Sequence, residues 1–171
     1  MDFAKGALGG GIKHFHFEEI DSTQKYVKRE FERFESTQMT LVTADFQTQG
    51  VGKGDRAWVA AKKKSVLATF AFNFPEECST KFCNDNAKNV SHVVALAAVQ
   101  VLRAAVPQEL TNSFEFKLKW PNDVLVNGKK MGGILAEAVT RRDIDGATRL
   151  GGVIVGIGLN INKSSEELAE I

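Results

Sequence analysis

Cysteine, proline and unbalanced charge are all scarce in this chain. Its two cysteines, Cys78 and Cys83, among 171 residues make neither a disulfide framework nor the paired CxxC spacing of a zinc site, so we expect two reduced thiols. Three prolines, 25% charged residues and 43% hydrophobic residues exclude a disordered chain and supply the core of one domain. Because 22 Lys and Arg face 21 Asp and Glu, the net charge of +1 gives no sign of general nucleic-acid or membrane-surface binding.

Long apolar runs are missing as well. The N-terminus has neither the basic start nor the apolar stretch of a signal peptide. The most apolar window, 93–106, is interrupted by Gln100 and Arg103 and is too short to span a bilayer. We therefore expect a soluble, cytoplasmic protein. The glycine-rich residues 1–12 are expected to form a flexible tail, followed by one folded domain at 13–171.

The spacing of apolar residues predicts the secondary structure. Capping side chains at 21–23 precede a predicted helix at 24–34, and an apolar face followed by Pro107 predicts an amphipathic helix at 89–106. Asn127-Gly128 predicts a two-residue type I′ hairpin. Period-two alternation or short apolar runs predict strands at 13–20, 39–46, 66–74, 114–120, 124–126, 129–139 and 150–161, with a polar turn at 141–148. This order predicts an α+β domain with one mixed, largely antiparallel sheet and helices on one face.

A glycine-rich polar loop follows the second predicted strand. Gly50, Gly52 and Gly54 let the backbone approach a ligand closely, while Lys53 and Arg56 bring positive charge to the same place. These are the requirements of polyphosphate binding, although the spacing fits neither a Walker A loop nor a GxGxxG motif. A flexible hairpin tip with solvated charges is the alternative interpretation of the loop alone.

Three more segments place polar residues or glycines where strands end. They are Lys119-Trp120-Pro121-Asn122-Asp123, the stretch from Lys129-Lys130 to Gly132-Gly133, and Gly156-Ile157-Gly158-Leu159-Asn160. Lysine and aspartate on adjacent strands are commonly surface ion pairs of little energy. Glycine inside a strand weakens it unless another group needs the room, so either tight packing or a flat ligand close to the backbone explains the glycines.

Taken in chain order, these segments resemble the catalytic domain of biotin protein ligase (holocarboxylase synthetase). The resemblance covers roughly residues 13–162 and rests on Asp21-Ser22-Thr23, Ala44-Asp45-Phe46-Gln47, the loop from Gly50 to Trp58, Lys119 to Asp123, Lys130-Met131-Gly132-Gly133-Ile134 and Gly156 to Asn160. It implies a biotin/lipoate ligase-like, class II synthetase-like fold. It also implies a ligase that converts biotin and ATP into biotinyl-5′-AMP and pyrophosphate, and then transfers biotin to a lysine of a carboxylase's biotin carboxyl carrier domain.

The resemblance also implies roles for individual residues. Biotin, ATP and Mg²⁺ are the expected ligands, with Mg²⁺ arriving with ATP and meeting Asp123 rather than a protein-only metal site. The catalytic set is Lys130, Asp123 and Lys119. The biotin-binding set is Ser22, Thr23, Gln47, Gly50, Val51, Gly52, Lys130, Gly132 and Gly133. The ATP and adenylate set is Lys53, Arg56, Trp58, Asn122, Asp123 and Asn160.

The chain departs from the family pattern in several places. Val51 stands where relatives often carry Arg or Lys, and Lys53 stands where they often carry Arg. Ala60-Ala61 and the lysine run 62–64 replace the Ser-Pro and Gly usually found after the tryptophan. The sequence ends nine residues after the last matching block, so the catalytic domain is expected to be short at its C-terminus. The first dozen residues hold no helix-turn-helix, which argues against the DNA-binding version of the family. The expected state is a monomer or homodimer that binds neither nucleic acid nor membrane.

Two other functions remain open. Lipoate ligases and octanoyl transferases share the implied fold, but their Arg-Arg-x-x-Gly-Gly-Gly block is absent here. A non-catalytic biotin-binding homologue is the second alternative, but the retention of Lys130, Asp123 and Arg56 argues against it, because a mere binder would not need phosphate-side cations.

Overall fold

A seven-stranded mixed sheet forms the centre of the computed structural model, which describes residues 11–54, 56–75, 89–142 and 146–162. The strand order is β1-β2-β3-β7-β6-β5-β4; β1 and β2 are parallel, and the remaining neighbours in this order are antiparallel. This confirms the predicted mixed, largely antiparallel sheet. The elements are β1 (Ile12–Phe17), α1 (Thr23–Glu30), η1 (Phe31–Arg33), β2 (Met39–Ala44), β3 (Ser65–Asn73), α3 (Val90–Ala105), η3 (Gln108–Ser113), β4 (Phe116–Lys119), β5 (Asp123–Val126), β6 (Lys129–Arg142) and β7 (Thr148–Asn160).

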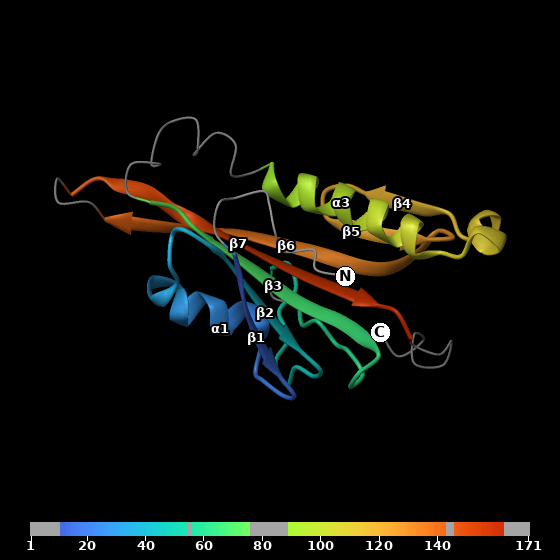
Figure 1. Ribbon diagram of the computed structural model, residues 1–171, viewed down its shortest axis with the longest axis horizontal. Helices are drawn as coiled ribbons and strands as arrows, with labels where there is room; N and C mark the ends of the chain where they lie inside the picture. Colours follow the sequence, from blue (N-terminus) through green and yellow to red (C-terminus); the bar gives the residue numbers. More distant parts are fainter. Residues whose placement is uncertain (1–10, 55, 76–88, 143–145, 163–171) are drawn as a thin grey trace.

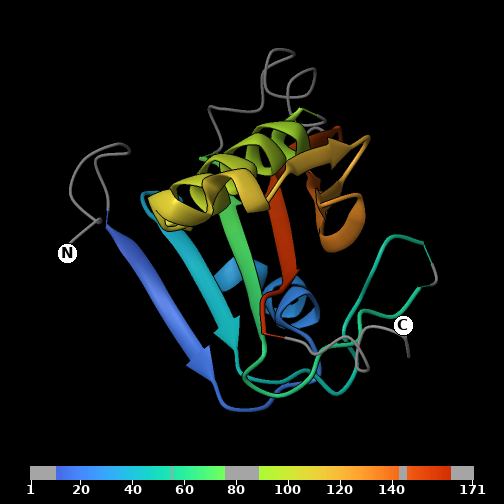
Figure 2. The same cartoon turned by 90° about the vertical axis from the view of Figure 1, so that its right-hand side faces the viewer.

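The helices α1 and α3 lie on opposite faces of the sheet (Figures 1 and 2). In β7, Ile154 packs with Val27 of α1, whereas the next residue, Val155, packs with Ala95 and Val99 of α3. Successive strand residues point to opposite faces, so the two helices cover different sides. This corrects the expectation of helices on one face. The reason lies in β7 itself, whose nearly unbroken apolar sequence needs cover on both sides.

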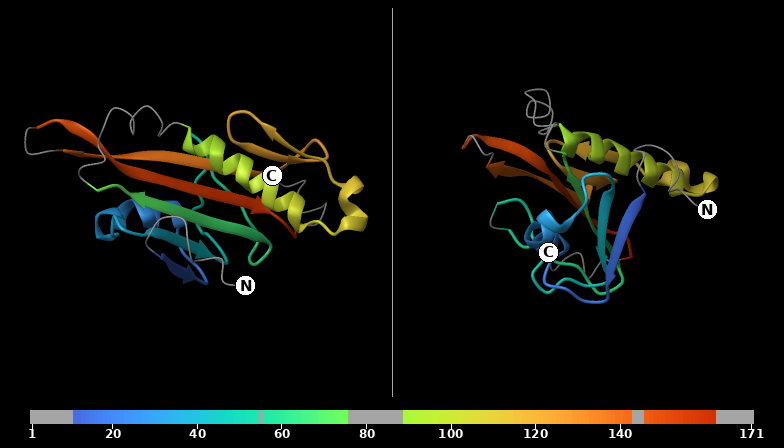
Figure 3. Two further views of the ribbon diagram at one scale, coloured as in Figure 1. Left: turned by 45° about the horizontal axis from the view of Figure 1, so that its top comes forward. Right: turned by 60° about the vertical axis from the view of Figure 1, so that its left-hand side comes forward.

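Local signals in the sequence account for most element boundaries. Ser22 is the N-cap of α1, and its side chain accepts a hydrogen bond from the Lys25 amide. Asn127 and Gly128 have φ values of 48° and 77°, which agrees with the predicted type I′ turn. The two long strands β6 and β7 extend through part of the segment predicted as a polar turn at 141–148 (Figure 3). Because Arg141 and Arg142 pair with Arg149 and Thr148, these polar residues belong to the sheet and not to the predicted turn.

Some sequence-based expectations concern the edges of the described part. β1 begins at Ile12, so the expected tail at 1–12 gives way to a strand one residue early, and residues 1–10 lie outside the described residues. Cys78 and Cys83 also lie outside them. In the edge strand β4, Phe116 is buried, whereas Trp120, just after the strand, is 80% exposed. Within the described part, no helix has the length and apolarity needed to cross a membrane.

Candidate active site

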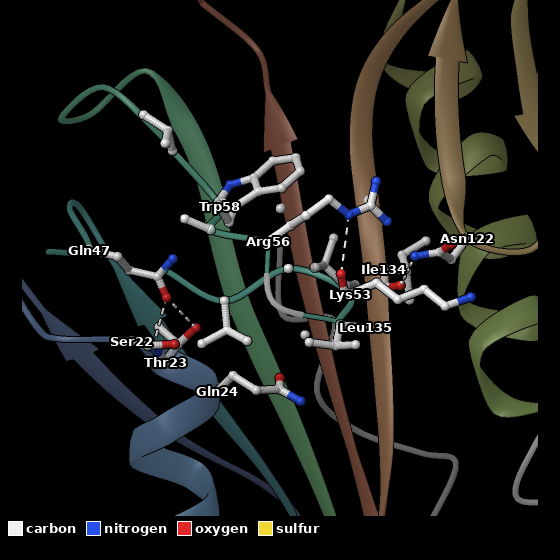
Figure 4. A pocket seen from close by; sticks show the side chains of 18 of the residues that line it. Ser22, Thr23, Gln24, Gln47, Lys53, Arg56, Trp58, Asn122, Ile134 and Leu135 are labelled. Carbon is white, nitrogen blue, oxygen red and sulfur yellow. Dashed lines mark hydrogen bonds between the residues drawn. The ribbon is translucent and has the colours of Figure 1, made fainter. Parts of the chain in front are cut away.

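A cavity of about 770 Å³ opens on the face of the sheet that carries α1, a volume in the range typical of small-molecule sites. Gly133 of β6 and Gly156 and Gly158 of β7 form its base. The segment between β2 and β3 passes over this base and contributes Trp58, Arg56 and Lys53 to the lining (Figure 4). The cavity therefore joins the strand ends and the glycine-rich loop that the sequence singled out.

The glycines of β7 make room for side chains of the protein itself. A Cβ added at Gly158 would lie 2.7 Å from Trp58 Cζ2, and one at Gly156 would overlap the amide oxygen of Gln24. By contrast, a Cβ at Gly133 would meet Trp58 at 3.5 Å, an ordinary contact. Gly156 and Gly158 thus let the Gln24 amide and the Trp58 indole lie against the sheet, as the tight-packing interpretation expects. The space above Gly133 is left for a ligand.

Two glycines of the expected biotin-binding set lie elsewhere. A Cβ at Gly132 would collide with Leu159 and lie 2.6 Å from the Gly158 oxygen, so this glycine faces the side of the sheet opposite to the cavity. Gly50 accepts a hydrogen bond from the Trp58 amide at 2.9 Å and is packed against the Trp58 carbonyl. Gly50 therefore shapes the loop, and neither residue lines the cavity.

One wall of the cavity is polar and lies at the N-terminus of α1. The Gln47 Oε1 atom accepts hydrogen bonds from the Thr23 amide at 2.7 Å and from the Thr23 hydroxyl at 3.0 Å (Figure 4). Ser22 is 1% exposed and its oxygen already caps the helix, with 3.4 Å to the Lys25 nitrogen. Because Gln47 receives both donors on its oxygen, its Nε2 group is left without a hydrogen-bond partner among the described residues.

A buried hydrogen-bond network continues from this wall beneath the cavity. The Thr69 hydroxyl lies 2.8 Å from Thr23 Oγ1 and 3.5 Å from Gln24 Oε1. The other end of the Gln24 amide donates to Glu137 Oε2 at 2.8 Å, and Lys28 Nζ lies 2.8 Å from Glu137 Oε1. Burial raises the pKa of Glu137, but the hydrogen bonds from Lys28 and Gln24 outweigh it, so the pKa lies below its usual value.

The lowered pKa of Glu137 predicts a specific loss of stability in acid. A carboxylate with a lower pKa in the folded than in the unfolded state stabilises the fold above the unfolded value of 4.5, and this contribution is lost as the pH falls through the folded value. We expect the free energy of unfolding of wild type to fall more between about pH 6 and about pH 3 than that of Glu137→Gln, measured by urea unfolding. Glu18→Gln, at an exposed carboxyl, is the control and should keep the wild-type dependence. Parallel pH dependences of Glu137→Gln and wild type would contradict the expectation.

The opposite side of the cavity is cationic. The side chains of Lys53, Arg56, Lys129 and Lys130 line it, and no carboxylate belongs to the lining that the structure describes. Arg56 Nε donates to the Lys53 carbonyl at 3.2 Å, which holds the loop cation in place. Positive charges gathered in a concave site favour an anionic ligand.

Lys130 is held at the edge of this cationic side by a neighbouring strand. Its Nζ atom lies 2.7 Å from Asp123 Oδ1, and its side chain is 46% exposed. Asp123 itself is not part of the lining. Lys119 lies opposite Asp123 in the neighbouring strand β4, and it does not line the cavity. Asn122 lines the cavity while its Nδ2 group donates to the Ile134 carbonyl at 2.9 Å. Asp123 at the start of β5, Asn122 just before it and Lys130 of β6 therefore lie close together.

Backbone hydrogen bonds close the base of the glycine-rich loop. Val51 and Ala57 form an antiparallel bridge, and the Gly52 amide donates to the Arg56 carbonyl at 2.8 Å. Trp58, at its end, has a buried Nε1 atom with no hydrogen-bond partner among the described residues. A buried indole N–H without a hydrogen-bond partner costs free energy.

Most of the residues expected from the sequence meet in this one cavity. Lining residues from that set are Ser22, Thr23, Gln47, Val51, Gly52, Lys53, Arg56, Trp58, Asn122, Lys130, Gly133 and Asn160. Gln24, Thr69 and Leu135 also line the cavity, and they were not among the residues expected from the sequence. Their only sequence signal is position: Gln24 follows the capping residues, while Thr69 and Leu135 lie within apolar strands. They line the cavity because of the side of the sheet that each one faces, which the sequence does not show.

The described residues form no cluster of three or more His, Cys, Asp or Glu side chains that could hold a metal ion. Asp123 is paired with Lys130 of the cationic side. A single carboxylate suits a Mg²⁺ ion that arrives on phosphate oxygens and keeps several waters, but it is not a site that holds the ion alone. We therefore assign no reaction step to a metal.

Comparisons with known proteins agree with this geometry. The family model described as "Biotin/lipoate A/B protein ligase family" matches residues 16–160. The bifunctional ligase/repressor BirA of Bacillus spizizenii is 29% identical over 92% of this chain and 43% of its own length. The biotin--[acetyl-CoA-carboxylase] ligase of Mycobacterium tuberculosis is 27% identical over 75% of this chain and 41% of its own. The chain therefore spans less than half the length of these two relatives.

A solved structure gives the same answer for the fold. The crystal structure of biotin protein ligase from Leishmania major in complex with biotinyl-5-AMP superposes with a TM-score of 0.60 at 26% identity, covering 89% of this chain and 58% of that one. The family match spans more than half of the chain, from β1 to the end of β7, and includes the residues that line the cavity. The chain therefore belongs to the biotin/lipoate A/B protein ligase family.

Proposed function

We propose that this protein is a biotin protein ligase that activates biotin with ATP as biotinyl-5′-AMP and then transfers the biotinyl group to a lysine of a carrier domain. The observation that carries the proposal is the composition of the cavity: a cationic side formed by Lys53, Arg56 and Lys130 faces a polar wall formed by Thr23 and Gln47. One side suits phosphates and a carboxylate, and the other suits a small polar ring.

The cationic side addresses the main physical difficulty of the first step. A biotin carboxylate must approach the α-phosphate of a polyanionic triphosphate, and the two groups repel each other. Fixed positive charges in a partly water-excluded cavity offset this repulsion more strongly than they would in solvent. Lys130 acts at the reacting carboxylate and α-phosphate, and the loop residues Lys53 and Arg56 bind phosphate oxygens. As the anions bind, Lys130 exchanges Asp123 for a phosphate or carboxylate oxygen.

The polar wall and the base of the cavity suit biotin. Its fused ring carries a urea group that needs a few hydrogen-bond partners, and its acyl chain needs apolar surroundings. The Gln47 amide has a free Nε2 group at the wall, while Gly133 leaves space along the sheet for the chain. Trp58 and Asn160 line the remaining space, where they contact the nucleotide.

The second step requires that the adenylate survives until its acceptor arrives. A mixed anhydride is hydrolysed in open water, so the hairpin at 50–58 shields it. The lysine nucleophile attacks the acyl carbon, AMP leaves, and an amide bond forms. The acceptor that we propose is the biotin carboxyl carrier domain of a carboxylase, a protein partner that meets the soluble ligase in the cytoplasm. Asp123 orients the incoming lysine.

Pyrophosphate release from ATP in the presence of biotin, lipoate or octanoate in turn tests this function. The proposal predicts release with biotin and a far lower rate with the two other acids. Preferential release with lipoate or octanoate would support the alternative ligases of the same family. Binding of biotin without any release would indicate a non-catalytic binding protein.

A further inference from the structure

One residue of β6 has no partner in the neighbouring strand β5. Leu125 of β5 lies opposite Lys130. The preceding residue of β5, Val124, lies opposite Gly132 and not opposite Met131. Met131 is therefore an extra residue in β6, and the two strands form a one-residue β-bulge at this point. The bulge directly follows the lysine that we place at the reacting groups.

The bulge decides which face of the sheet Lys130 meets. In a regular strand, residues 130 and 132 would share a face, because successive side chains alternate. Gly132 faces the side of α3, since a Cβ there would collide with Leu159 of the core on that side. Lys130 lies on the cavity side instead, because its Cε atom is 3.9 Å from the Cβ position of Gly133. The extra residue thus places the lysine on the cavity side.

Two separate constraints in the sheet require this extra residue. The two-residue turn at Asn127-Gly128 fixes how the first residues of β6 pair with β5. Further along β6, Gly132 pairs with Leu159 of β7, while Val124 of β5 is fully buried in the core beside α3. Both sets of contacts can hold together only if β6 has one residue more than β5 between them. Met131 is that residue.

The side chains at the bulge match the two faces of the sheet. The unbranched, apolar side chain of Met131 packs against the core beside α3, and methionine fills irregular spaces of this kind well. Lys130, on the other face, is 46% exposed, and its Nζ atom lies 2.7 Å from Asp123 Oδ1. A lysine ammonium among the apolar side chains beside α3 would be costly. The order Lys130-Met131 therefore fits the bulged strand and would not fit a regular one.

We propose that Met131 is a positioning residue for catalysis: as the extra residue of the bulge, it places Lys130 in the cavity. The proposal rests on the proposed function and deepens it, because Met131 does not line the cavity and acts only through Lys130. It explains why the lysine acts from position 130, although Gly133, three residues along the same strand, faces the same cavity.

Two variants that remove the bulge in different ways test the proposal. An alanine inserted between residues 124 and 125 gives Met131 a partner and turns Lys130 toward α3, so biotin-dependent pyrophosphate release should fall about a hundredfold. Deleting Met131 also makes the pairing regular, but it keeps Lys130 opposite Leu125 on the cavity side. The deletion should therefore retain a rate about tenfold or more above that of the insertion. Biotin affinity, measured by calorimetry, should change far less than the rate in both variants.

Exchanging the two residues adds a rescue that a merely structural role would not produce. Lys130→Met combined with Met131→Lys should abolish the rate in the native strand, because residue 131 faces the core beside α3. In the insertion variant residue 131 faces the cavity, so the same exchange should raise the rate about tenfold or more above that of the insertion alone.

The outcomes separate this inference from the proposed function. If wild type is active and either the insertion or the exchange in the native strand keeps its rate, the inference about Met131 is overturned and the proposed function stands. If wild type releases no pyrophosphate with biotin, both are overturned. Should the insertion fail to fold, as judged by thermal unfolding, the exchange and the deletion decide: a much lower rate in the exchange supports the inference, and equal rates overturn it.

Discussion

Replacing Lys130 with alanine is expected to lower the rate of biotin-dependent pyrophosphate release by about a hundredfold or more. Removing one preorganised group that stabilises transition-state charge typically costs two to three orders of magnitude. Here the loss is compounded, because Asp123 Oδ1 lies 2.7 Å from Lys130 Nζ and would be left as an uncompensated negative charge beside two anions. Biotin binding should weaken much less than the rate, since the lysine acts mainly where charge develops.

Lys117→Ala is the matched control for this experiment. Lys117 lies on the nearby strand β4, is ion-paired with Glu115 at 2.7 Å and does not line the cavity. Its replacement should leave the rate within about twofold of wild type, as expected for an exposed pair. A second variant, Lys130→Ala with Asp123→Asn, should recover part of the lost rate. A rate for Lys130→Ala close to that of wild type would contradict the role of this lysine.

The Gly52→Pro change is expected to let free adenylate escape about tenfold faster. Proline has no amide proton, so it removes the hydrogen bond from residue 52 to the Arg56 carbonyl, which measures 2.8 Å. The hairpin that carries Lys53 and Arg56 would lose one of its ties, and with it the ability to shield the anhydride. Biotinyl-5′-AMP released into solution is measured by rapid filtration followed by chromatography.

Gly52→Ala provides a graded comparison. It keeps the amide proton but places a Cβ 3.0 Å from the Arg56 carbonyl oxygen, so it should show a smaller increase in escape than proline. Lys53→Gly should also accelerate escape, because it removes a phosphate-side cation without touching the hairpin hydrogen bond. Unchanged escape in both Gly52→Pro and Lys53→Gly, with intact thermal unfolding, would show that the loop does not hold the adenylate.

Local chemistry in the sequence predicted the elements better than their arrangement. The helix start at Thr23, the Asn127-Gly128 turn and the amphipathic helix α3 each have a cause within a few residues, and each lies near its predicted place. The side of the sheet that each helix covers is decided by long-range contacts, such as Val27 with Ile154. No pattern within one segment specifies which face of a distant strand it meets. The same limit explains why β6 and β7 extend beyond their predicted ends.

The candidate site shows the same division between local and long-range information. Residues whose type is unusual for their element, such as the loop cations Lys53 and Arg56, stood out in the sequence. Thr69 and Gln24 did not, because a threonine in a strand and a glutamine in a helix are ordinary. Gly132 was misplaced for a related reason: adjacent glycines face opposite sides of a strand, and only the pairing of β6 with β7 shows which one meets the cavity.

We propose above all that Lys130 and the hairpin cations act together on one anionic intermediate in one cavity. The most direct test is a crystal structure of this chain with a non-hydrolysable analogue of biotinyl-5′-AMP. We expect the phosphate of the analogue to lie within hydrogen-bond distance of Lys130 and of Lys53 or Arg56, with the biotin ring against Thr23 and Gln47. A phosphate bound away from Lys130, with the Lys130–Asp123 pair intact, would contradict it.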